Sequence, residues 1–346
     1  MIKEKNLITS FDFYVLGGEQ IAKISDEQFS LIFDVIKDAY ALYGNKESVN
    51  PNSYFLRFPD KVNARMIALP SYIGGSFDVA GIKWISSYPD NIKQGIQRAS
   101  AVIILNDYET GYPFACLEGS LISALRTANS AVLAAECINE SLNISDVSLG
   151  IVGNGFIAQK IYQVFKIREW EFKKIYLYDT LKNECNKFKD LQIPESEKYK
   201  VTICNSVEEL LGKSSLIVFT TTASIPYVKS LKLLEHNPII LHISLRDLSP
   251  QIILSSYNIV DDIDHILSAN TSVDLAYQQS NTENFITSTL SDLILRKVSL
   301  KNDKPIIFSP MGLGVLDLAL GKHIFDKALE MKVVQRYSDF FYNIGR

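Results

Sequence analysis

The chain has 346 residues, more than one ordinary hydrophobic core holds, so two domains are expected. Hydrophobic residues make up 47% and charged residues 21%, as in globular proteins, and the net charge of −4 disfavours nucleic-acid binding through a basic surface. No apolar run reaches the roughly 20 residues that span a bilayer, and the first residues lack the apolar core of a signal peptide. The four histidines show no metal-ligand spacing. We therefore expect a cytoplasmic protein that uses neither a metal, a membrane nor a nucleic acid.

The N-terminal part carries the patterns of an α+β domain. Residues 26–43 place apolar side chains at helical spacing after an Asp/Ser start. Four short apolar runs bounded by turns then predict strands: YFLRF, RMIALPSYI, VAGIKWISS and SAVIILND. Residues 114–138, rich in Ala, Ser and Leu, predict one long helix.

From residue 147 onward, apolar strands alternate with helical segments. VSLGIVG and KIYLYD predict strands on either side of the helix FIAQKIYQVFK, and SLIVFTTT, PIILHIS, YNIVDD and PIIFSP predict further strands. This alternation is typical of a doubly wound parallel sheet. LDLALGKHIFDKALEMK then predicts an amphipathic helix that packs back on the first domain. The predicted fold is α/β: a Rossmann-type domain (129–318) inserted in an N-terminal α+β domain (1–128 plus 319–346).

The segment GNGFIA at 153–158 matches the dinucleotide pattern G-x-G-x-x-[GA] between a predicted strand and a predicted helix. Its glycines let the backbone approach a pyrophosphate, and the helix N-terminus favours negative charge. Asp179 ends the next predicted strand, where a carboxylate accepts hydrogen bonds from a ribose 2′-hydroxyl and repels a 2′-phosphate. We therefore predict NAD rather than NADP; the alternative is a glycine turn with no ligand. The predicted contacts are Gly153, Asn154, Gly155, Phe156, Ile157, Asp179 and Thr180.

Three further predicted strands end in loops suited to ribose and nicotinamide contacts, since ligands of such sheets lie at the carboxyl ends of strands. Ordinary loop chemistry is the alternative for each. The predicted contacts are Thr220, Thr221, Thr222, Ser244, Leu245, Asp247, Met311 and Gly312.

Several charges lie in apolar surroundings, where an unpaired charge is costly. Arg126 is the only charged residue between Glu118 and Glu136, and its planar fork suits a substrate carboxylate; an internal ion pair is the alternative. Lys83 lies in the apolar run GIKWIS, and its alternative is snorkelling to solvent. Asp247 follows an apolar strand and suits a proton acceptor, with a helix N-cap as the alternative. Two arginines flanking Pro59 also suit a carboxylate, or are surface charges: Arg57 and Arg65.

Taken together, RMIALPSYIGG, AGIKWIS, RASAVIILNDYETGYP, SLISALRTA, GNGFIA and SPMGLGVLDLA resemble the ornithine cyclodeaminase/mu-crystallin family from about residue 30 to 330. The resemblance implies a homodimer formed through the N-terminal domain and an active site between domains. The run from Ala64 to Ala128 is most similar to family members that release 2,3-diaminopropionate for siderophore and peptide-antibiotic synthesis. They use NAD to cleave N-(2-amino-2-carboxyethyl)-L-glutamate oxidatively.

The resemblance also assigns roles to residues. It makes Lys83 a substrate contact, Arg126 a contact of substrate and cofactor, and Asp247 the general acid/base. It places Thr127 near the cofactor and Met311 across the nicotinamide from the substrate. The catalytic residues it implies are Lys83, Asp247 and Arg126, and the substrate-binding residues are Arg57, Arg65, Lys83, Arg126 and Met311.

The loop after Asp247 departs from ornithine cyclodeaminases, because Leu-Ser-Pro-Gln replaces their Gly- and Lys-containing loop. Three alternatives remain open from the sequence: an ornithine or lysine cyclodeaminase, a ketimine- or opine-type reductase, and a mu-crystallin-like protein that holds the cofactor without turnover.

Overall fold

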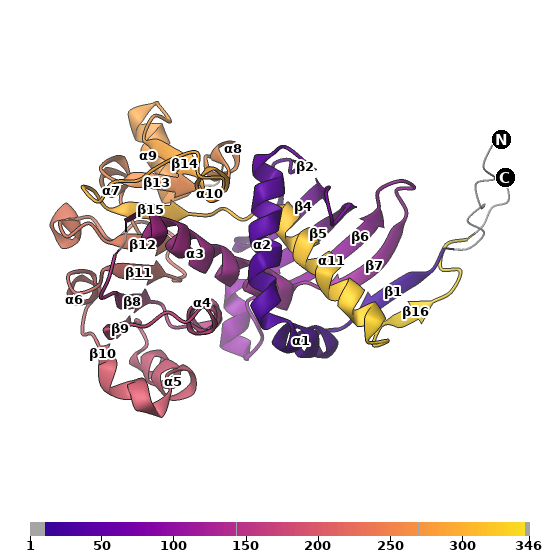
Figure 1. Cartoon of the computed structure of the whole chain (residues 1–346), viewed down its shortest axis with the longest axis horizontal. Coiled ribbons are helices and arrows are strands. Elements are labelled where there is room, and N and C mark those ends of the chain that lie inside the picture. Colours follow the sequence, from indigo (N-terminus) through magenta and orange to yellow (C-terminus); the bar gives the residue numbers. More distant parts are fainter. Residues whose placement is uncertain (1–10, 143, 269, 343–346) are drawn as a thin grey trace. The chain divides into compact units, whose positions relative to one another are not determined.

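The computed structural model describes residues 11–142, 144–268 and 270–342. The chain divides into two compact units, whose elements Figure 1 labels. Unit 1 comprises Met1–Ser123 and Gly314–Arg346, and unit 2 comprises Ala124–Leu313.

Unit 1 is built on a mixed sheet with strand order β16-β1-β7-β6-β5-β4-β2, in which β3 also pairs with β4. All its pairings are antiparallel except that of β1 with β7. The strands are β1 (Phe13–Leu16), β2 (Ser48–Val49), β3 (Tyr54–Phe58), β4 (Lys61–Ile73), β5 (Val79–Ser87), β6 (Ala99–Asp107), β7 (Pro113–Glu118) and β16 (Gln335–Tyr337).

Helices cover one face of this sheet. The helix α11 lies across β4, β5 and β6, and α2 packs on α11, so the predicted return of the C-terminal helix to the first domain is confirmed (Figure 1). Side chains alternate accordingly: in β6, Ala101, Ile103 and Leu105 are buried, whereas Ser100 and Val102 are exposed. The helices of unit 1 are α1 (Gly18–Glu27), α2 (Phe29–Gly44), the 3₁₀ helix η1 (Pro89–Gln94) and α11 (Gly314–Glu330).

Unit 2 contains a parallel sheet with strand order β10-β9-β8-β11-β12-β15-β13-β14. Its central strands are apolar and fully buried, as expected for strands covered on both faces. The strands are β8 (Ser148–Val152), β9 (Lys174–Tyr178), β10 (Val201–Ile203), β11 (Leu216–Phe219), β12 (Ile239–His242), β13 (Tyr257–Val260), β14 (Ile286–Thr289) and β15 (Ile306–Ser309). The strand order reverses between β8 and β11, where doubly wound sheets bind ligands.

Helices connect these strands, most of them short. They are α3 (Ser120–Leu142), α4 (Phe156–Ile167), α5 (Lys182–Gln192), η2 (Glu195–Lys200), α6 (Val207–Leu211), η3 (Leu231–Leu234), α7 (Pro250–Leu254), α8 (Ile263–Ile266), α9 (Ser272–Ser280) and α10 (Leu290–Ile294). The α3 helix begins in unit 1 and continues into unit 2. The predicted fold class, a Rossmann-type parallel sheet together with an α+β part, is confirmed.

Some predicted elements were wrong in detail. The helix predicted over 114–138 begins only at Ser120, because the first residues of that run form β7. The Glu118 carboxylate accepts the N–H groups of Ser120 and Leu121 and so fixes the start of α3. The helix predicted over 26–43 is two helices that meet at Gln28. Five short strands were not predicted: β1, β2, β10, β14 and β16.

By length and composition alone, α3 is long and apolar enough to cross a membrane. However, 67% of its most apolar window is buried inside the protein, as is common for a core helix. Among the described residues it is the one helix that meets this test.

Candidate functional site

The loop after β8 has the geometry of a phosphate-binding turn. Gly153 adopts a φ of +85°, and a Cβ there would lie 2.8 Å from the Thr220 carbonyl oxygen, so only glycine fits. No atom lies within 4 Å of a Cβ position at Gly155. The α4 helix begins directly after it, with no side chain capping its first N–H groups. These open donors fit the pyrophosphate of a dinucleotide.

Asp179 stands beside this loop. Its Oδ2 accepts the backbone N–H of Asn154 at 2.8 Å, and its Oδ1 accepts that of Leu181 at 2.9 Å. Asn154 is fully buried and donates from Nδ2 to the Tyr178 carbonyl at 2.8 Å, which ties the loop to the end of β9. A half-buried carboxylate fixed next to the glycine loop fits the ribose of NAD and opposes a 2′-phosphate.

Contacts run from the glycine loop to Asp247. The Thr220 hydroxyl donates to the Gly153 carbonyl at 2.6 Å, and the neighbouring Thr221 hydroxyl donates to Asp247 Oδ1. The Tyr227 hydroxyl donates to the same oxygen at 3.1 Å. The loops after β8, β11 and β12 therefore meet at one edge of the parallel sheet, with Asp247 at their junction.

Asp247 forms a buried pair with His242, and neither side chain is exposed. The His242 Nε2 lies 3.1 Å from the Asp247 backbone nitrogen and 3.2 Å from Oδ2, and its Nδ1 lies 3.3 Å from the Ser309 hydroxyl. Burial raises the pKa of Asp247, but the contact with the His242 imidazole and the hydrogen bonds from Ser244 and Thr221 outweigh burial and lower that pKa below its ordinary value. The carboxylate is therefore held ionised, as a proton acceptor requires.

The loop that carries Asp247 is strained. Leu245 adopts a φ of +67°, a conformation that side-chain-bearing residues avoid, and Ser272 N–H donates to its carbonyl at 2.7 Å. The alternative of a helix N-cap is wrong, because Ser249 is the N-cap residue of α7. Strain of this kind persists where surrounding contacts fix a functional loop.

Arg126 packs against the loop after β15. Gly312 adopts a φ of +95°, and a Cβ there would lie 2.6 Å from Arg126 Nη1, so glycine lets the guanidinium approach the backbone. Asp261 holds this loop from β13: its carboxylate accepts the Met311 N–H at 2.9 Å and the Gly312 N–H. Burial raises the pKa of Asp261, although these two N–H groups act to lower it.

In unit 1, Lys83 is buried with a counter-ion. Its ammonium forms an ion pair with Asp317 of α11 and donates to the Ser123 hydroxyl at 3.2 Å. Its side chain is 2% exposed, so the alternative of snorkelling to solvent is wrong. Arg57 and Arg65 lie further along the same sheet face, directly opposite each other across β3 and β4.

The predicted site residues thus fall into two groups. Most of those in unit 2 follow the carboxyl ends of the parallel strands, where Met311 is half-buried and Thr180 and Thr222 are exposed. Arg126 and Thr127 lie on α3, and Thr127 is half-buried. Ile157 is half-buried and Phe156 is 54% exposed at the start of α4. The unit 1 residues are Lys83, Arg57 and Arg65.

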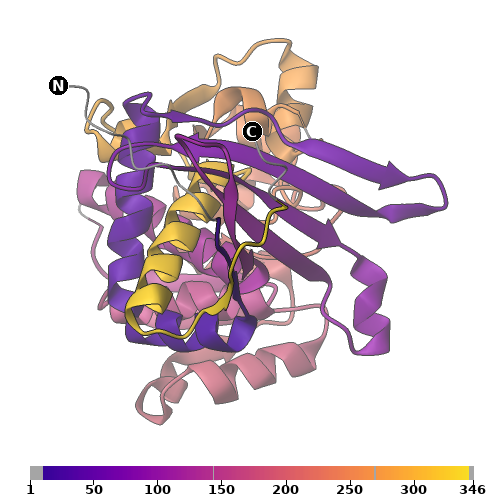
Figure 2. The same cartoon turned by 90° about the vertical axis from the view of Figure 1, so that its right-hand side faces the viewer.

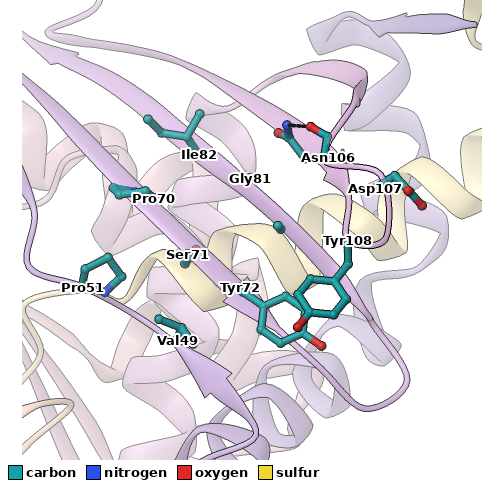
Figure 3. A pocket seen from close by; sticks show the side chains of 12 residues that line it. Val49, Pro51, Pro70, Ser71, Tyr72, Gly81, Ile82, Asn106, Asp107 and Tyr108 are labelled. Atoms are coloured by element: carbon teal, nitrogen blue, oxygen red, sulfur yellow. Dashed lines mark hydrogen bonds between the residues drawn. The ribbon is translucent and has the colours of Figure 1, made fainter. Parts of the chain in front are cut away.

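On the face of the unit 1 sheet opposite to the one that carries Lys83 and α11 (Figure 2), there is a cavity of about 440 Å³ (Figure 3). Its lining includes Pro70, Tyr72, Ile82 and Tyr108, and the two tyrosine rings stack at 4.2 Å. None of the predicted site residues lines it. Within the described ranges, no group of three or more His, Cys, Asp or Glu residues is arranged to hold a metal ion.

Sequence reasoning missed three buried charged or titratable residues of these clusters: Asp317, His242 and Asp261. The same signal that singled out Arg126, a charged or titratable residue in apolar surroundings, was available for all three, because each of them lies in or directly after an apolar run. Their partners could not be read from the sequence, since Lys83 and Asp317 are 234 residues apart.

The similarity of the chain to known proteins identifies its family. Residues 19–332 match the ornithine cyclodeaminase/mu-crystallin family. The chain belongs to this family. The predicted membership is thereby confirmed.

One curated member of the family is N-((2S)-2-amino-2-carboxyethyl)-L-glutamate dehydrogenase from Staphylococcus aureus. It is 27% identical over 327 residues, which cover 92% of this chain and 96% of that protein.

Two solved structures share the fold of the whole chain. The Δ1-pyrroline-2-carboxylate reductase of Thermococcus litoralis, in complex with NADH and L-proline, has a TM-score of 0.81 at 23% identity and covers 93% of this chain and 99% of its own. An archaeal alanine dehydrogenase dimer with bound NAD has a TM-score of 0.83 at 22% identity and covers 96% of this chain and 100% of its own. Both therefore share the fold of this chain over nearly its whole length.

Proposed function

We propose that the protein is an NAD-dependent dehydrogenase that cleaves N-(2-amino-2-carboxyethyl)-L-glutamate oxidatively. The observation that carries the proposal is the run of contacts from the glycine loop through Thr220 and Thr221 to Asp247. It puts an ionised carboxylate next to a dinucleotide cradle. The relative from S. aureus supports this substrate, since it matches this chain over nearly its whole length.

In the proposed reaction, N-(2-amino-2-carboxyethyl)-L-glutamate, NAD⁺ and water give L-2,3-diaminopropionate, 2-oxoglutarate, NADH and a proton. Bound NAD⁺ supplies the hydride acceptor for the glutamate Cα. Asp247 takes the proton of the secondary amine, and the carbon–nitrogen single bond becomes an imine. Asp247 then assists the attack of water, and the carbon–nitrogen bond breaks to release the two products.

The other proposed site residues bind and orient. The guanidinium of Arg126 holds a substrate carboxylate in its planar fork, and Gly312 leaves it the room to do so. Lys83, which forms an ion pair with Asp317, provides a second cation for the substrate. We assign NAD binding to unit 2 and a substrate contact to Lys83 of unit 1. In unit 2, Asp179 selects NAD over NADP.

We also propose that the protein is a homodimer formed through the uncovered face of the unit 1 sheet. On that face Trp84 and Val102 are register partners that remain 36% and 39% exposed, and Leu56 is 46% exposed. Exposed apolar faces of this kind mark interaction surfaces. We propose that a second copy of this chain covers the face, because the structurally similar archaeal alanine dehydrogenase is a dimer.

The experiment is a turnover assay that follows NADH formation from NAD⁺ with a panel of substrates. The proposal expects turnover of N-(2-amino-2-carboxyethyl)-L-glutamate and release of 2-oxoglutarate. L-Ornithine, L-alanine and L-proline serve as controls for cyclodeaminase, alanine dehydrogenase and the reverse of pyrroline-2-carboxylate reduction. Faster turnover of any of the three would overturn the proposed substrate, and NADH binding without turnover of the panel would favour a cofactor-holding protein.

A further inference from the structure

The carboxylate of Asp247 is enclosed by protein groups. Its side chain is 0% exposed, so bulk water does not touch it. Oδ1 accepts the hydroxyls of Thr221 and Tyr227, and Oδ2 accepts that of Ser244 and lies 3.2 Å from His242 Nε2. The proposed reaction brings a proton to this carboxylate in every turnover. That proton has to reach solvent through one of the groups that contact the carboxylate.

Two of these four partners do not lead outward. His242 is buried, and its Nδ1 faces the hydroxyl of Ser309, which is buried as well. The Thr221 hydroxyl donates to Asp247 and accepts the Ala223 N–H at 3.1 Å, so its hydrogen is held toward the carboxylate. A proton handed to either group would stay inside the protein.

Tyr227 connects the carboxylate with the surface. Its hydroxyl is 3.1 Å from Asp247 Oδ1, and the residue is 39% exposed, whereas Ser244 is half-buried. A phenol hydroxyl is both a donor and an acceptor, and its O–H bond can turn about the C–O axis. It can therefore receive a proton from a carboxylic acid while it gives its own proton to water.

The backbone holds Tyr227 against Asp247. The N–H groups of Tyr227 and Val228 both donate to the Asp247 carbonyl, at 3.0 and 2.9 Å. The Ser249 N–H donates to the Val228 carbonyl at 2.9 Å, and Val228 forms a parallel bridge with Leu248. These contacts join the loop after β11 to the segment that carries Asp247, so the phenol returns to the residue that its own backbone contacts.

The electrostatics favour transfer outward. Burial, followed by the negative charge of Asp247, raises the pKa of Tyr227, so the phenol stays neutral and does not replace Asp247 as the base. The pKa of Asp247 is lowered by its contacts, which makes its protonated form a stronger acid. A carboxyl group that yields its proton readily thus lies next to a hydroxyl that can pass a proton on.

We infer that Tyr227 is a positioning residue of the reaction, whose hydroxyl relays the proton from Asp247 to bulk water. In this step the O–H bond of protonated Asp247 breaks and its proton bonds to the phenol oxygen. The original phenol O–H bond breaks at the same time, and its proton goes to water. Asp247 is then ionised and Tyr227 neutral, as before turnover. The inference rests on the proposed function for the role of Asp247 as proton acceptor.

The test is Tyr227→Phe, which keeps the ring and both backbone hydrogen bonds and removes the hydroxyl. Its kcat should fall roughly tenfold to a hundredfold, less than for loss of the proton acceptor itself, and KM should change little. Because proton transfer would then limit turnover, its kcat should decrease in D₂O by a larger factor than the kcat of the wild type. Steady-state NADH formation in H₂O and D₂O measures both effects.

A small buffer distinguishes a proton relay from a structural contact. Imidazole, added at constant pH and ionic strength, can accept a proton from the water that fills the place of the missing hydroxyl. It should therefore raise the kcat of Tyr227→Phe several-fold and leave that of the wild type unchanged. A hydroxyl that merely held the two loops together would leave a defect that imidazole does not repair.

The matched control is Tyr257→Phe, which removes a hydroxyl that donates to Asp303 Oδ1 at 2.9 Å at the start of β13. It should equal the wild type in kcat, in its response to D₂O and in its response to imidazole. A wild-type kcat in Tyr227→Phe overturns the relay. So does a lower kcat with wild-type responses to D₂O and imidazole, or the same changes in Tyr257→Phe.

The substrate panel separates this inference from the proposed function. Each variant is assayed with whichever of the four substrates the wild type turns over fastest. Faster turnover of L-ornithine, L-alanine or L-proline overturns the proposed substrate, whereas the responses of Tyr227→Phe still decide the relay. NADH binding without turnover of any of the four overturns both, since no proton would then pass through Asp247.

Discussion

The ammonium of Lys83 and the carboxylate of Asp317 form an ion pair inside the sheet–helix interface of unit 1. Their side chains are 2% and 0% exposed, and the Ser123 hydroxyl accepts a further hydrogen bond from the ammonium. A buried charge is tolerated when it is both paired and hydrogen-bonded. Asp317 therefore compensates the buried charge of Lys83 at this point of the sheet, and α11 holds Asp317 in place.

Asp317→Asn should destabilise the protein by about 3–5 kcal/mol, because it leaves the buried ammonium of Lys83 without its counter-ion. Urea unfolding followed by circular dichroism measures the change. The double variant Lys83→Met/Asp317→Leu replaces both charges by apolar groups and should recover most of the lost stability. Because it lacks the cation, it should still fail to turn over the substrate. Wild-type turnover by the stable double variant would show that Lys83 is structural.

Asp247→Asn should lower kcat by roughly 10²–10⁴-fold, because the amide keeps the shape of the side chain and removes the proton acceptor. The Kd for NADH should change little. Steady-state kinetics and a fluorescence titration with NADH measure the two effects. Ser249→Ala is the control in the same loop, since Ser249 is the N-cap position of α7 and makes no side-chain cap bond. Near-wild-type kcat in Asp247→Asn would mean that the carboxylate only holds the loops together.

The buried carboxylates of Asp247 and Asp261 should affect stability in opposite directions as pH changes. The pKa of Asp247 is lower in the folded protein than its ordinary value of about 3.9. Its stabilising contribution is therefore complete above that value and is lost as pH falls through the folded pKa. The pKa of Asp261 is raised by burial, so its contribution is present below the ordinary value and is lost as pH rises through the folded pKa.

Urea unfolding between pH 3 and 7 (roughly one unit below the ordinary aspartate pKa to neutrality) checks these signs. As pH falls, the difference in free energy of unfolding between the wild type and Asp247→Asn should shrink. The corresponding difference between the wild type and Asp261→Asn should grow. The same pH slope in both variants would contradict the assignment of opposite shifts.

The sequence predicted the parallel sheet well because its strands are buried on both faces and read as continuous apolar runs, as in β11 and β12. It failed where an element depends on contacts distant in sequence. The edge strand β10, only three residues long, pairs with β9 alone. The start of α3 was wrong for a different reason, because β7 has only six residues and runs almost directly into the helix, so its alternation is too short to separate it from the helical pattern.

The candidate site shows the same limit. The G-x-G-x-x-[GA] pattern needs residues close in sequence, so the cradle at Gly153 was accessible to sequence reasoning. The partners of Asp247 come from the loop after β11, which carries Thr221 and Tyr227, and from the end of β12, where His242 carries no motif of its own. Asp261 acts on the backbone of Met311, a contact that follows from β13 and β15 being neighbours in the sheet.

Asp179→Ala should narrow the preference for NAD over NADP by roughly tenfold or more, because it removes both the acceptor for the ribose hydroxyls and the charge that opposes a 2′-phosphate. Fluorescence titration with NADH and NADPH measures both Kd values. Asp190→Ala is the matched control, an aspartate of α5 whose side chain is 69% exposed. Tighter binding of NADPH than NADH by the wild type would show that this reading of Asp179 is wrong.

The uncovered face of the unit 1 sheet should hold two copies together. Trp84 and Val102 are opposite each other on β5 and β6, at 36% and 39% exposure, so a charge at either position would be buried in the interface. Sedimentation equilibrium of the wild type at micromolar concentration should give about twice 38.9 kDa. Trp84→Glu and Val102→Glu should each shift the protein toward the monomer, since an unpaired buried charge is strongly unfavourable.

The control for this prediction is Leu191→Glu, which adds the same charge at a 73% exposed apolar residue of α5 in unit 2. It should sediment like the wild type, and all three variants should keep the far-ultraviolet circular dichroism of a folded protein. A doubled wild-type mass that only the two sheet variants reduce would identify a second copy of this chain as the occupant of the face. A wild type that stays monomeric at this concentration and is fully active would mean that this face does not hold a second copy.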